Sequence, residues 1–395
     1  MKKILVVHPN NFLKGDQGEN ARTLELVRIF NEIGYKVDHL GYSNFHIPND
    51  FVNHQKQNTE NLVNELFLYD YGNAPGSRSP IALLKKIGRG VHRRIKSIKT
   101  KRYLQDWAPE AAKRYFRKIT TENNYDAIVL FYTYLTNLLE DANLSAKKVY
   151  SMEDCIFLQQ HTWGLGDTGN TTLGRLMDEE LELLKNFDEI FCISHDEKLM
   201  YEKFTGKTMH FVPHLQPSGV TKSSIPINER KWDVMYVGAG NPYNIEGINW
   251  FAREVYPLLN KNLRMVFIGS VLGALDVRHS NIDLIHFAPS LNEMYNNSKI
   301  TICPMFRGTG MKIKVVESMA RGLPVVCNDR GVDGMPDKTK SGCLVSQDAQ
   351  GFAGHINRLL NDSSFYNETV KNIEDYYGHI FSRNIYIELL KKILQ

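Results

Sequence analysis

The feature that most constrains the fold is an alternation of short apolar runs with helical stretches, which occurs twice along the chain. Near the start, an apolar strand at 4–7 precedes a helical pattern at 21–33 and a strand at 36–40, and Gly34 suits the helix C-cap. Further strand patterns lie at 127–131, 148–151 and 189–193, with a helix over about 176–186. Such alternation predicts a parallel sheet covered by helices, the α/β class.

The alternation breaks at 213–230, which is rich in Pro, Ser and polar residues, and then resumes. The second series has strand patterns at 234–237, 265–268, 282–287, 300–303, 324–327 and 343–345, and helical patterns at about 247–259 and 312–321. A chain of 395 residues suits two such domains. We therefore expect an N-terminal domain over 1–215, a linker over 216–231, a C-terminal domain over 232–378, and a helix over 379–395 that could return to the first domain. The carboxyl ends of both sets of strands should face a cleft.

Composition excludes several classes of protein. No apolar run approaches the ~20 residues of a membrane-spanning helix, and the opening MKKILVV is too short for a signal-peptide core. The 5 Cys form no C-x-x-C pair, which argues against a disulfide framework or a thiolate zinc site. His210 and His214 have the i, i+4 spacing of helical metal ligands, but Pro213 between them argues against a helix. We expect a cytoplasmic protein without a metal.

One segment accounts for the basic charge of the chain. Residues 78–105 contain ten Lys or Arg and no Asp or Glu, so the remainder is net negative although the total is +4. Apolar residues recur there at helical spacing, which predicts a helix with one apolar stripe and a positively charged face. This basic amphipathic helix could dock on an anionic membrane, where each Lys or Arg contributes about 1 kcal/mol, or attract an anionic acceptor. A solvated helix is the plainer alternative, and nucleic acid binding is not expected because stacking aromatics are absent.

The most informative stretch is FRGTGMKIKVVESMARGLPVV, residues 306–326. Gly308 and Gly310 permit a tight turn that leads directly into a helix, and a helix N-terminus suits a phosphate or diphosphate. Arg307 and Lys312 lie beside that end. The pattern therefore predicts an anion-binding loop.

A helical wheel divides the residues that follow into two faces. The expected buried face is Val315, Val316, Met319 and Ala320, and the other is Lys314, Glu317, Ser318 and Arg321. At the border, Glu317 could reach a ligand lying across the helix, for instance the paired hydroxyls of a ribose. Alternatively, Glu317 only makes surface ion pairs with Lys314 and Arg321, worth a few tenths of a kcal/mol each. The wheel leaves both interpretations open.

The stretch resembles the C-terminal motif of the large retaining "group 1" glycosyltransferases, family 4. The matching residues are Arg307, Gly308, Gly310, Lys312, Lys314, Glu317, Ala320, Gly322, Pro324, Val325 and Val326. The likeness continues through WDVMYVGAGNPYNIEGINWF and LIHFAPSLNEMYNNSKITICP, and more thinly through YSMEDCIF and ELELLKNFDEIFCIS. It implies the GT-B architecture, two tandem Rossmann-like domains facing each other across a cleft. It also implies transfer of a sugar from a nucleotide diphosphate sugar to an acceptor hydroxyl, with no further cofactor.

The resemblance implies roles for particular residues. Glu317 matches the glutamate on the ribose, and Arg307 and Lys312 match catalytic cations near the diphosphate. The other donor-binding positions are Gly238, Gly240, Phe287, Gly308, Thr309, Gly310, Met311 and Lys314. Two departures stand out: Thr309 replaces a glutamate that often contacts the donor sugar, and GAGNPYNIEG lacks the Arg and Lys of many members.

In the N-terminal half, Glu153 and Asp154 match positions where many relatives have His and Asp. We expect these catalytic candidates to orient acceptor or sugar hydroxyls; a helix-capping Asp beside a solvated Glu is the alternative. The long loop HPNNFLKGDQGENAR lies where open α/β sheets bind ligands, so Gly15 and Gly18 are also donor-binding candidates.

These observations together predict a retaining glycosyltransferase whose partners are a nucleotide-sugar donor and a glycan or lipid-linked acceptor. Its expected role is cell-surface polysaccharide or glycolipid synthesis at the inner face of the membrane. One alternative is a sugar-nucleotide epimerase of the same fold, which would need no acceptor. The other is a non-catalytic nucleotide-sugar-binding subunit of a transferase complex, which would not hydrolyse the donor.

Overall fold

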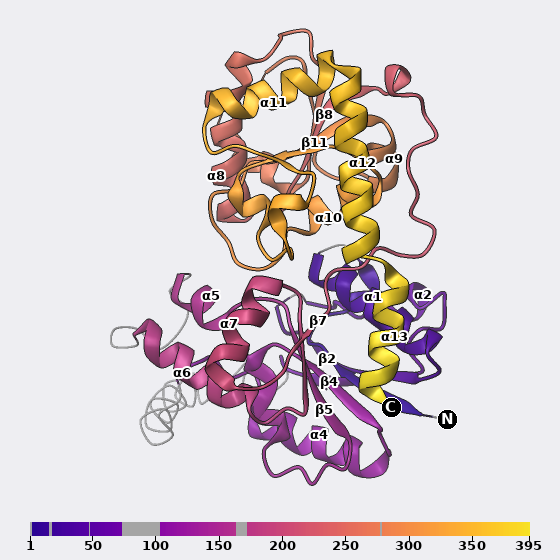
Figure 1. Ribbon diagram of the computed structural model, residues 1–395. Coiled ribbons are helices and arrows are strands. Elements are labelled where there is room, and N and C mark those ends of the chain that lie inside the picture. Colours follow the sequence, from indigo (N-terminus) through magenta and orange to yellow (C-terminus); the bar gives the residue numbers. More distant parts are fainter. Residues whose placement is uncertain (1, 16–17, 47, 73–102, 163–171, 277–278) are drawn as a thin grey trace, which may run out of the picture. The chain divides into compact units, whose positions relative to one another are not determined.

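The computed structural model describes residues 2–15, 18–46, 48–72, 103–162, 172–276 and 279–395 (Figure 1). The chain divides into two compact units. The first comprises Met1–Ile193, Glu197–Val212 and Ile387–Gln395, and the second Ser194–Asp196 and Pro213–Tyr386. The basic stretch at 78–105 lies, up to residue 102, outside the described residues.

The first unit has a seven-stranded parallel sheet of order β3-β2-β1-β4-β5-β6-β7. The strands are β1 (Lys3–Val7), β2 (Lys36–Ser43), β3 (Glu65–Asp70), β4 (Ala127–Phe131), β5 (Lys147–Met152), β6 (Glu189–Cys192) and β7 (His210–Phe211). The helices are α1 (Gly18–Glu32), α2 (His54–Gln57), α4 (Glu110–Glu122), α5 (Ile156–Thr162), α6 (Leu173–Leu184), most of α7 (His195–Thr205) and most of α13 (Arg383–Leu394). The strand order reverses between β1 and β4, and such a reversal is where open α/β sheets bind ligands.

The second unit has a six-stranded parallel sheet of order β10-β9-β8-β11-β12-β13. The strands are β8 (Trp232–Val237), β9 (Met265–Ile268), β10 (Ile282–Ile285), β11 (Ser298–Cys303), β12 (Val325–Cys327) and β13 (Leu344–Val345). The helices are α8 (Pro242–Trp250), α9 (Leu291–Asn296), α10 (Ile313–Ala320), α11 (Ala349–Asn361) and α12 (Ser363–Ile380). Here the order reverses between β8 and β11.

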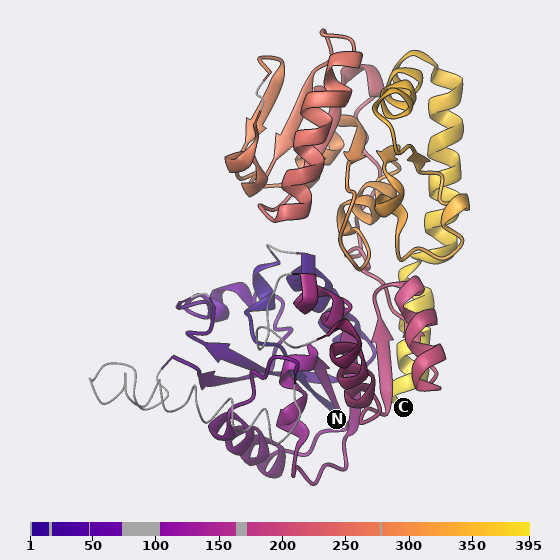
Figure 2. The same ribbon diagram turned by 90° about the vertical axis from the view of Figure 1, so that its left-hand side faces the viewer.

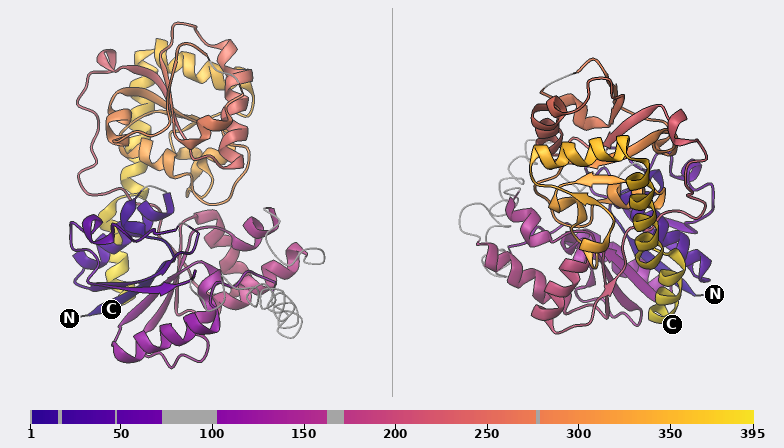
Figure 3. Two further views of the ribbon diagram at one scale, coloured as in Figure 1. Left: turned by 180° about the vertical axis from the view of Figure 1, so that it is seen from behind. Right: turned by 45° about the horizontal axis from the view of Figure 1, so that its top comes forward.

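Helices cover both faces of the second sheet, which explains its continuous apolar strands. One face packs on α8 and α11 through a core that includes Tyr236, Ile248 and Phe352. The opposite face packs on α9 through Met235 and Tyr295, and β8 and β11 lie between α8 and α9 in Figure 1. Figures 2 and 3 show the same layers from other directions. Among the described residues, no helix has the length and hydropathy needed to cross a bilayer.

Several element boundaries differ from the sequence expectation. The helix expected from about 247 begins at Pro242, because the Asn241 side chain caps it by accepting a hydrogen bond from the Asn244 amide. It continues as a π-helix over Phe251–Val255 and a 3₁₀ turn over Tyr256–Leu258. The expected linker at 216–231 packs with the second unit, and the expected helix at 379–395 comprises the end of α12 and all of α13.

Candidate active site

Two loops meet at the strand-order reversal of the second unit. The segment 238–241 follows β8, and the segment 304–312, which includes the glycine loop 306–312, follows the neighbouring strand β11. A Cβ added to Gly247 on α8 would lie 1.5 Å from the carbonyl oxygen of Pro304, and one added to Gly308 would lie 3.5 Å from Cδ2 of Tyr243. Gly247 thus allows α8 to approach the end of β11 closely, whereas a Cβ on Gly308 would make only an ordinary contact with Tyr243.

The glycine loop is held by its own lysine. Gly308 and Gly310 have φ values of 109° and 69°, which glycine adopts without strain. The Nζ atom of Lys312 donates to the carbonyls of Thr309 and Gly310 at 3.1 and 3.0 Å, and only 6% of Lys312 is exposed. The ammonium therefore lies against the loop carbonyls. The prediction of Lys312 as a cation for the diphosphate does not include this packing against the loop.

Arg307, the other expected catalytic cation, lies at the surface. Its side chain is 69% exposed and pairs with Glu246 of α8 over 3.1 Å. An exposed ion pair of this kind is worth at most about 1 kcal/mol, so the guanidinium can exchange this partner for a ligand phosphate at little cost. Arg307 thus combines a charge with freedom to reorient.

The loop after β8, residues 238–241, has no charged side chain and exposes mainly its backbone. The amide of Gly240 donates to Oγ of Ser270 over 2.8 Å, and a Cβ on Gly240 would lie 3.2 Å from the Ser270 carbonyl oxygen. A Cβ on Gly238 would lie 2.5 Å from the Tyr236 hydroxyl. Both expected glycines are therefore required by close packing at this loop.

Lys314 connects α10 with α8 and β8. Its Nζ donates to Oδ1 of Asn244 on α8 over 2.7 Å and lies 4.7 Å from the centre of the Tyr236 ring. Burial lowers the pKa of the Lys314 ammonium. A lysine of α10 thus lies next to α8, in a region where GAGNPYNIEG itself contains no Lys or Arg.

Glu317 is half-buried and is held by a neighbouring tyrosine. Its Oε2 accepts a hydrogen bond from the hydroxyl of Tyr295 on α9 over 2.9 Å, and burial raises the pKa of its carboxyl while this bond opposes the shift. Arg321 lies 4.5 Å from the centre of the Tyr295 ring and donates to the Glu317 carbonyl, not to its carboxylate. The interpretation of Glu317 as a surface ion-pair residue was wrong, because its carboxylate bonds a buried tyrosine.

The helical wheel was also partly wrong. Val315, Val316 and Met319 are buried as expected, but Ser318 and Arg321 are buried too, while Ala320 is only half-buried. The reason is that α10 is covered on both sides. Arg321 donates to the Gln216 side chain over 3.2 Å, so the segment after the domain boundary covers the face that the wheel assigned to solvent.

The remaining donor-binding candidates differ in exposure. Thr309 is half-buried in the glycine loop, whereas Met311 is 6% exposed and packs inward. Phe287 follows β10 and is 79% exposed, so its ring is available at the carboxyl edge of the sheet. An exposed aromatic ring can stack on a nucleotide base.

In the first unit, Glu153 forms an ion pair with a buried arginine. Arg22 of α1, which is 1% exposed, donates to Glu153, to Oγ of Ser151 over 2.8 Å and to the Val212 carbonyl over 2.8 Å. Burial raises the pKa of Glu153 to about 7, although Arg22 opposes the shift. The alternative of a solvated Glu153 was therefore wrong. Arg22 itself was missed, although a charged residue within the helical pattern at 21–33 was its sequence signal.

Asp154 and the two N-terminal glycines lie near the same strand ends. Asp154 is half-buried and accepts a hydrogen bond from Gln159 over 3.1 Å. Gly15 is exposed with φ 59°. Gly18 was expected in the loop but is the first residue of α1, because the helix begins three residues earlier than its apolar pattern.

Tyr132, at the end of β4, was missed as well. Its φ of 65° is unusual for a residue with a side chain, and its hydroxyl donates to Oε2 of Glu19 over 2.6 Å. No local sequence pattern predicts this conformation or the contact with Glu19, because Glu19 and Tyr132 are far apart in the chain.

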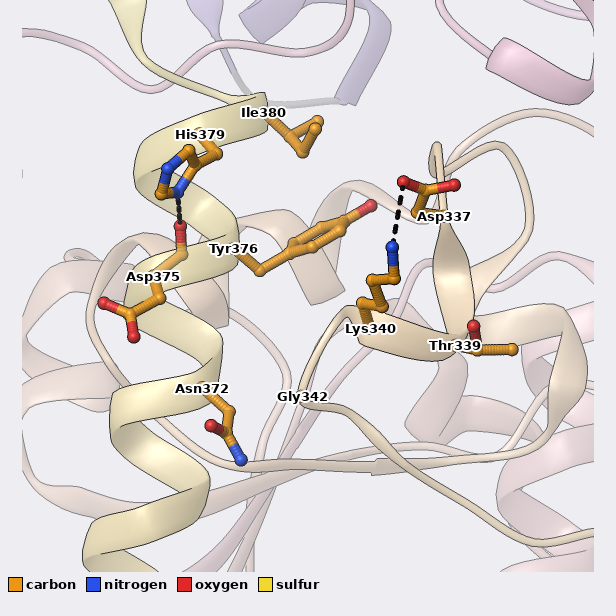
Figure 4. A pocket seen from close by; sticks show the side chains of 9 residues that line it. All are labelled: Asp337, Thr339, Lys340, Gly342, Asn372, Asp375, Tyr376, His379 and Ile380. Carbon is orange, nitrogen blue, oxygen red and sulfur yellow. Dashed lines mark hydrogen bonds and ion pairs between the residues drawn. The ribbon is translucent and has the colours of Figure 1, made fainter.

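The second unit also contains two surface pockets. One of about 510 Å³ lies between α12 and 337–342, where His379 Nδ1 is 2.6 Å from the Asp375 carbonyl and Lys340 faces Asp337 (Figure 4). It contains none of the residues singled out from the sequence. A pocket of about 670 Å³ lies at the carboxyl ends of β11, β12 and β13, lined in part by Phe306, which precedes Arg307. Among the described residues, no group of three or more His, Cys, Asp or Glu could hold a metal ion.

Comparisons with known proteins agree with this geometry. Residues 231–362 match the family "Glycosyl transferases group 1". An uncharacterized 44.6 kDa protein in the cps region of Klebsiella pneumoniae is 20% identical over 307 residues, 70% of this chain and 76% of that protein. Sucrose-phosphate synthase from Thermosynechococcus elongatus is similar in structure, with a TM-score of 0.70 and 13% identity over 100% of this chain and 98% of that chain. A TarM variant from S. aureus, in complex with fondaparinux, alpha-GlcNAc-glycerol and UDP, has a TM-score of 0.68 at 11% identity over 100% of both chains.

The family match falls on the second unit, where the glycine loop and Glu317 lie. The similar structures extend over the whole chain and share its fold, so the expected architecture of two tandem Rossmann-like domains is confirmed. We conclude that residues 231–362 are similar to the group 1 glycosyltransferases and that the chain has the GT-B fold.

Proposed function

We propose that this glycosyltransferase uses a nucleotide diphosphate sugar and retains the configuration of the transferred sugar. The observation that supports the proposal is the convergence of Glu317, Lys314 and the glycine loop at the strand-order reversal of the second unit. A carboxylate suits ribose hydroxyls, while a cation and the start of α10 suit a diphosphate. UDP in the complex of the TarM variant supports a uridine diphosphate donor.

The charges suit the step in which the glycosidic bond to the diphosphate breaks. Negative charge then develops on the leaving diphosphate, and fixed cations stabilise it most when they need no reorganisation. Lys314 is fixed by Asn244 and Lys312 by the loop carbonyls, whereas Arg307 is free to turn. A diphosphate oxygen accepts the proton of the attacking hydroxyl on the same face. This proposed step uses no metal.

We further propose a role in cell-surface polysaccharide synthesis, with a glycan or lipid-linked acceptor. The similarity to a protein in a cps region supports this role. The charge of 78–105 supports peripheral contact with anionic lipid at the inner face of the membrane. Replacing Lys85, Arg93, Arg94 and Lys96 with Gln should then reduce flotation with phosphatidylglycerol vesicles, and binding should weaken with salt. Equal binding to neutral vesicles would contradict the membrane proposal.

The decisive test of donor binding is Glu317→Ala in the full chain. Loss of a charged hydrogen bond costs about 1.5–3 kcal/mol, so the Kd for UDP in isothermal titration should rise about tenfold to a hundredfold. Glu368→Ala is a matched control, because Glu368 is an exposed glutamate of α12 in the same unit. An unchanged Kd in folded Glu317→Ala protein would refute the ribose assignment.

Donor turnover separates transfer from the alternatives. A transferase should consume the donor sugar faster when an acceptor is added, and should hydrolyse it slowly without one. An epimerase would convert the donor without any acceptor. A non-catalytic subunit would bind UDP but leave the donor intact.

A further inference from the structure

The pocket between α12 and the segment 337–342 is separate from the residues proposed to bind the donor (Figure 4). Its volume is about 510 Å³, within the range of about 300–1,000 Å³ that is usual for small-molecule sites. All of its lining residues belong to the second unit, and neither the loop at 238–241 nor the glycine loop contributes to it. A ligand bound there would therefore leave the proposed donor site free.

The two walls of this pocket are fixed to each other. Gly342 has a φ of 77°, and a Cβ there would lie 2.7 Å from the amide nitrogen of Ile373 on α12. The Tyr376 hydroxyl of α12 donates to the Pro336 carbonyl, and Figure 4 shows its side chain crossing from the helix toward the opposite wall. The pocket is thus formed before any ligand binds, which lowers the entropic cost of binding.

The helix wall offers oriented polar groups along one face of α12. The lining residues Asn372, Asp375, Tyr376 and His379 recur at spacings of three and one, which places them on the same side of the helix. Nδ1 of His379 lies 2.6 Å from the Asp375 carbonyl, and a carbonyl only accepts, so Nδ1 donates and Nε2 remains for a ligand. The exposed amide of Asn372 can both donate and accept.

The opposite wall offers a carboxylate and an ammonium side by side. Nζ of Lys340 lies 3.7 Å from Oδ2 of Asp337, and the two side chains are 76% and 73% exposed. Such an exposed pair is weak, so both groups can bind a ligand instead. Asp337 has a φ of 44° and a ψ of 42°, a left-handed conformation in which the backbone fixes where this carboxylate starts.

The charges of the lining select against an anion. Among the described residues that line the pocket, there are two carboxylates, Asp337 and Asp375, and one ammonium, Lys340. A phosphate or a uronic acid would add negative charge beside these carboxylates. A hydroxyl both donates and accepts, so neighbouring hydroxyls of a neutral ring can donate to Asp337 and accept from Lys340 and Asn372.

We propose that this pocket is a second glycan-binding site, which holds a neutral pyranose unit apart from the donor loops. The inference rests on the proposed role in polysaccharide synthesis and names a place where a long chain is held at a sugar remote from the reaction. A pyranose ring presents its hydroxyls in fixed directions, whereas an acyclic polyol must lose internal rotations to do so.

The test uses the full-length protein with methyl pyranosides of glucose, galactose, mannose and N-acetylglucosamine. The methyl pyranoside of glucuronic acid is the anionic comparison, and sorbitol is the acyclic one. Saturation-transfer NMR should show that at least one neutral pyranoside binds, and that the glucuronide and sorbitol bind about tenfold more weakly, a difference of about 1.4 kcal/mol. Saturating UDP should not displace the bound pyranoside, because the donor loops do not line the pocket.

Two substitutions connect this binding to the pocket. Asp337→Asn keeps a residue that adopts the left-handed conformation, so it should fold, weaken the neutral pyranoside about tenfold and reduce the discrimination against the glucuronide. Asn372→Ala should weaken the neutral pyranoside severalfold. Asn367→Ala is the matched control, since Asn367 is an exposed asparagine of α12 that does not line the pocket.

Titration with UDP separates this inference from the proposed function. All three variants should bind UDP as the wild type does. If the wild type binds UDP but no neutral pyranoside, or binds sorbitol or the glucuronide equally well, the glycan inference is wrong and the donor assignment stands. Pyranoside binding that is unchanged in Asp337→Asn and Asn372→Ala also overturns it. If the wild type does not bind UDP, the donor assignment fails, and these two variants still decide whether the pocket binds the pyranoside.

Discussion

At the scale of single residues, Tyr295 and Arg321 determine how Glu317 can act. The Tyr295 hydroxyl bonds one carboxylate oxygen, and the guanidinium of Arg321 packs on the Tyr295 ring. Tyr295 is 1% exposed, so its hydroxyl has few other positions available. Glu317 is therefore held in one orientation.

The first prediction concerns Tyr295→Phe, which removes only the hydroxyl. The bond from Tyr295 lowers the pKa of Glu317, which burial raises, so the variant should raise that pKa further. If donor binding needs the ionised carboxylate, the variant should lose UDP binding at a higher pH than the wild type as the pH is lowered. The Kd for UDP, measured by titration at several pH values, checks this. Superimposable pH profiles for the wild type and the variant would contradict it.

At the scale of elements, the site depends on how closely α8 packs on the end of β11. A Cβ on Gly247 would lie 1.5 Å from the Pro304 oxygen, a distance that no relaxation of a side chain can relieve. The Asn241 cap begins α8 directly after the loop that follows β8. The short loop at 238–241 is a consequence of this early helix start.

The second prediction is that Gly247→Ala weakens both stability and donor binding. Overpacking costs about 1–3 kcal/mol or more, and displacement of α8 would move Asn244 away from Lys314. Urea unfolding and UDP titration measure the two effects. Gly354→Ala on α11 is the matched control, since a Cβ there meets nothing within 4 Å and should stabilise the helix by about 0.5–1 kcal/mol. Equal effects of both substitutions would rule out the packing explanation.

The third prediction concerns α5 and α6 of the first unit. Glu180 of α6 accepts the amides of Ile156 and Phe157 at the start of α5, and burial raises its pKa from 4.5 to about 8. Between pH 4.5 and about pH 8, the Glu180 carboxyl is therefore protonated in the folded unit but ionised in the unfolded chain. Stability from this group is therefore present at low pH and is lost as pH rises towards about 8, by at most about 1.4 kcal/mol per pH unit.

Urea unfolding from about pH 5 to pH 8 tests this linkage. Glu180→Gln keeps an oxygen for one of the two amides and cannot titrate, so it should flatten the pH dependence. Glu182→Gln on the same helix is the control, because the Glu182 side chain is 70% exposed. A wild-type slope that survives in Glu180→Gln would assign the dependence to other groups.

At the scale of the whole molecule, the end of the chain belongs to the first unit rather than the second. Residues 387–395 pack there, and the Tyr35 hydroxyl donates to the Leu394 carbonyl over 2.6 Å. The buried side chains of this segment are Ile387, Leu390, Ile393 and Leu394. Burial of one such side chain is worth about 1.5–3 kcal/mol, so the segment contributes several kcal/mol to the first unit.

The fourth prediction is that deletion of 387–395 destabilises the first unit selectively. Hydrogen exchange should accelerate in peptides from β1 and β2, whereas β8 and β11 serve as an internal reference. Removal of Gln395 alone is the matched control, since that residue is exposed. Equal acceleration in both sheets would show that the segment stabilises the units together.

The sequence by itself determined the α/β class, the two series of strands and the position of the glycine loop, because these depend on local periodicity and on the φ values that only glycine adopts freely. It also singled out Glu317 as a candidate for the donor ribose, which stays a prediction. Tertiary structure alone decided that Tyr295 holds Glu317, that Lys314 reaches α8, and that Tyr132 reaches Glu19. These pairs are 22, 70 and 113 residues apart. Contacts at such separations depend on how strands are ordered in a sheet and which helices cover it, and no local pattern encodes that order.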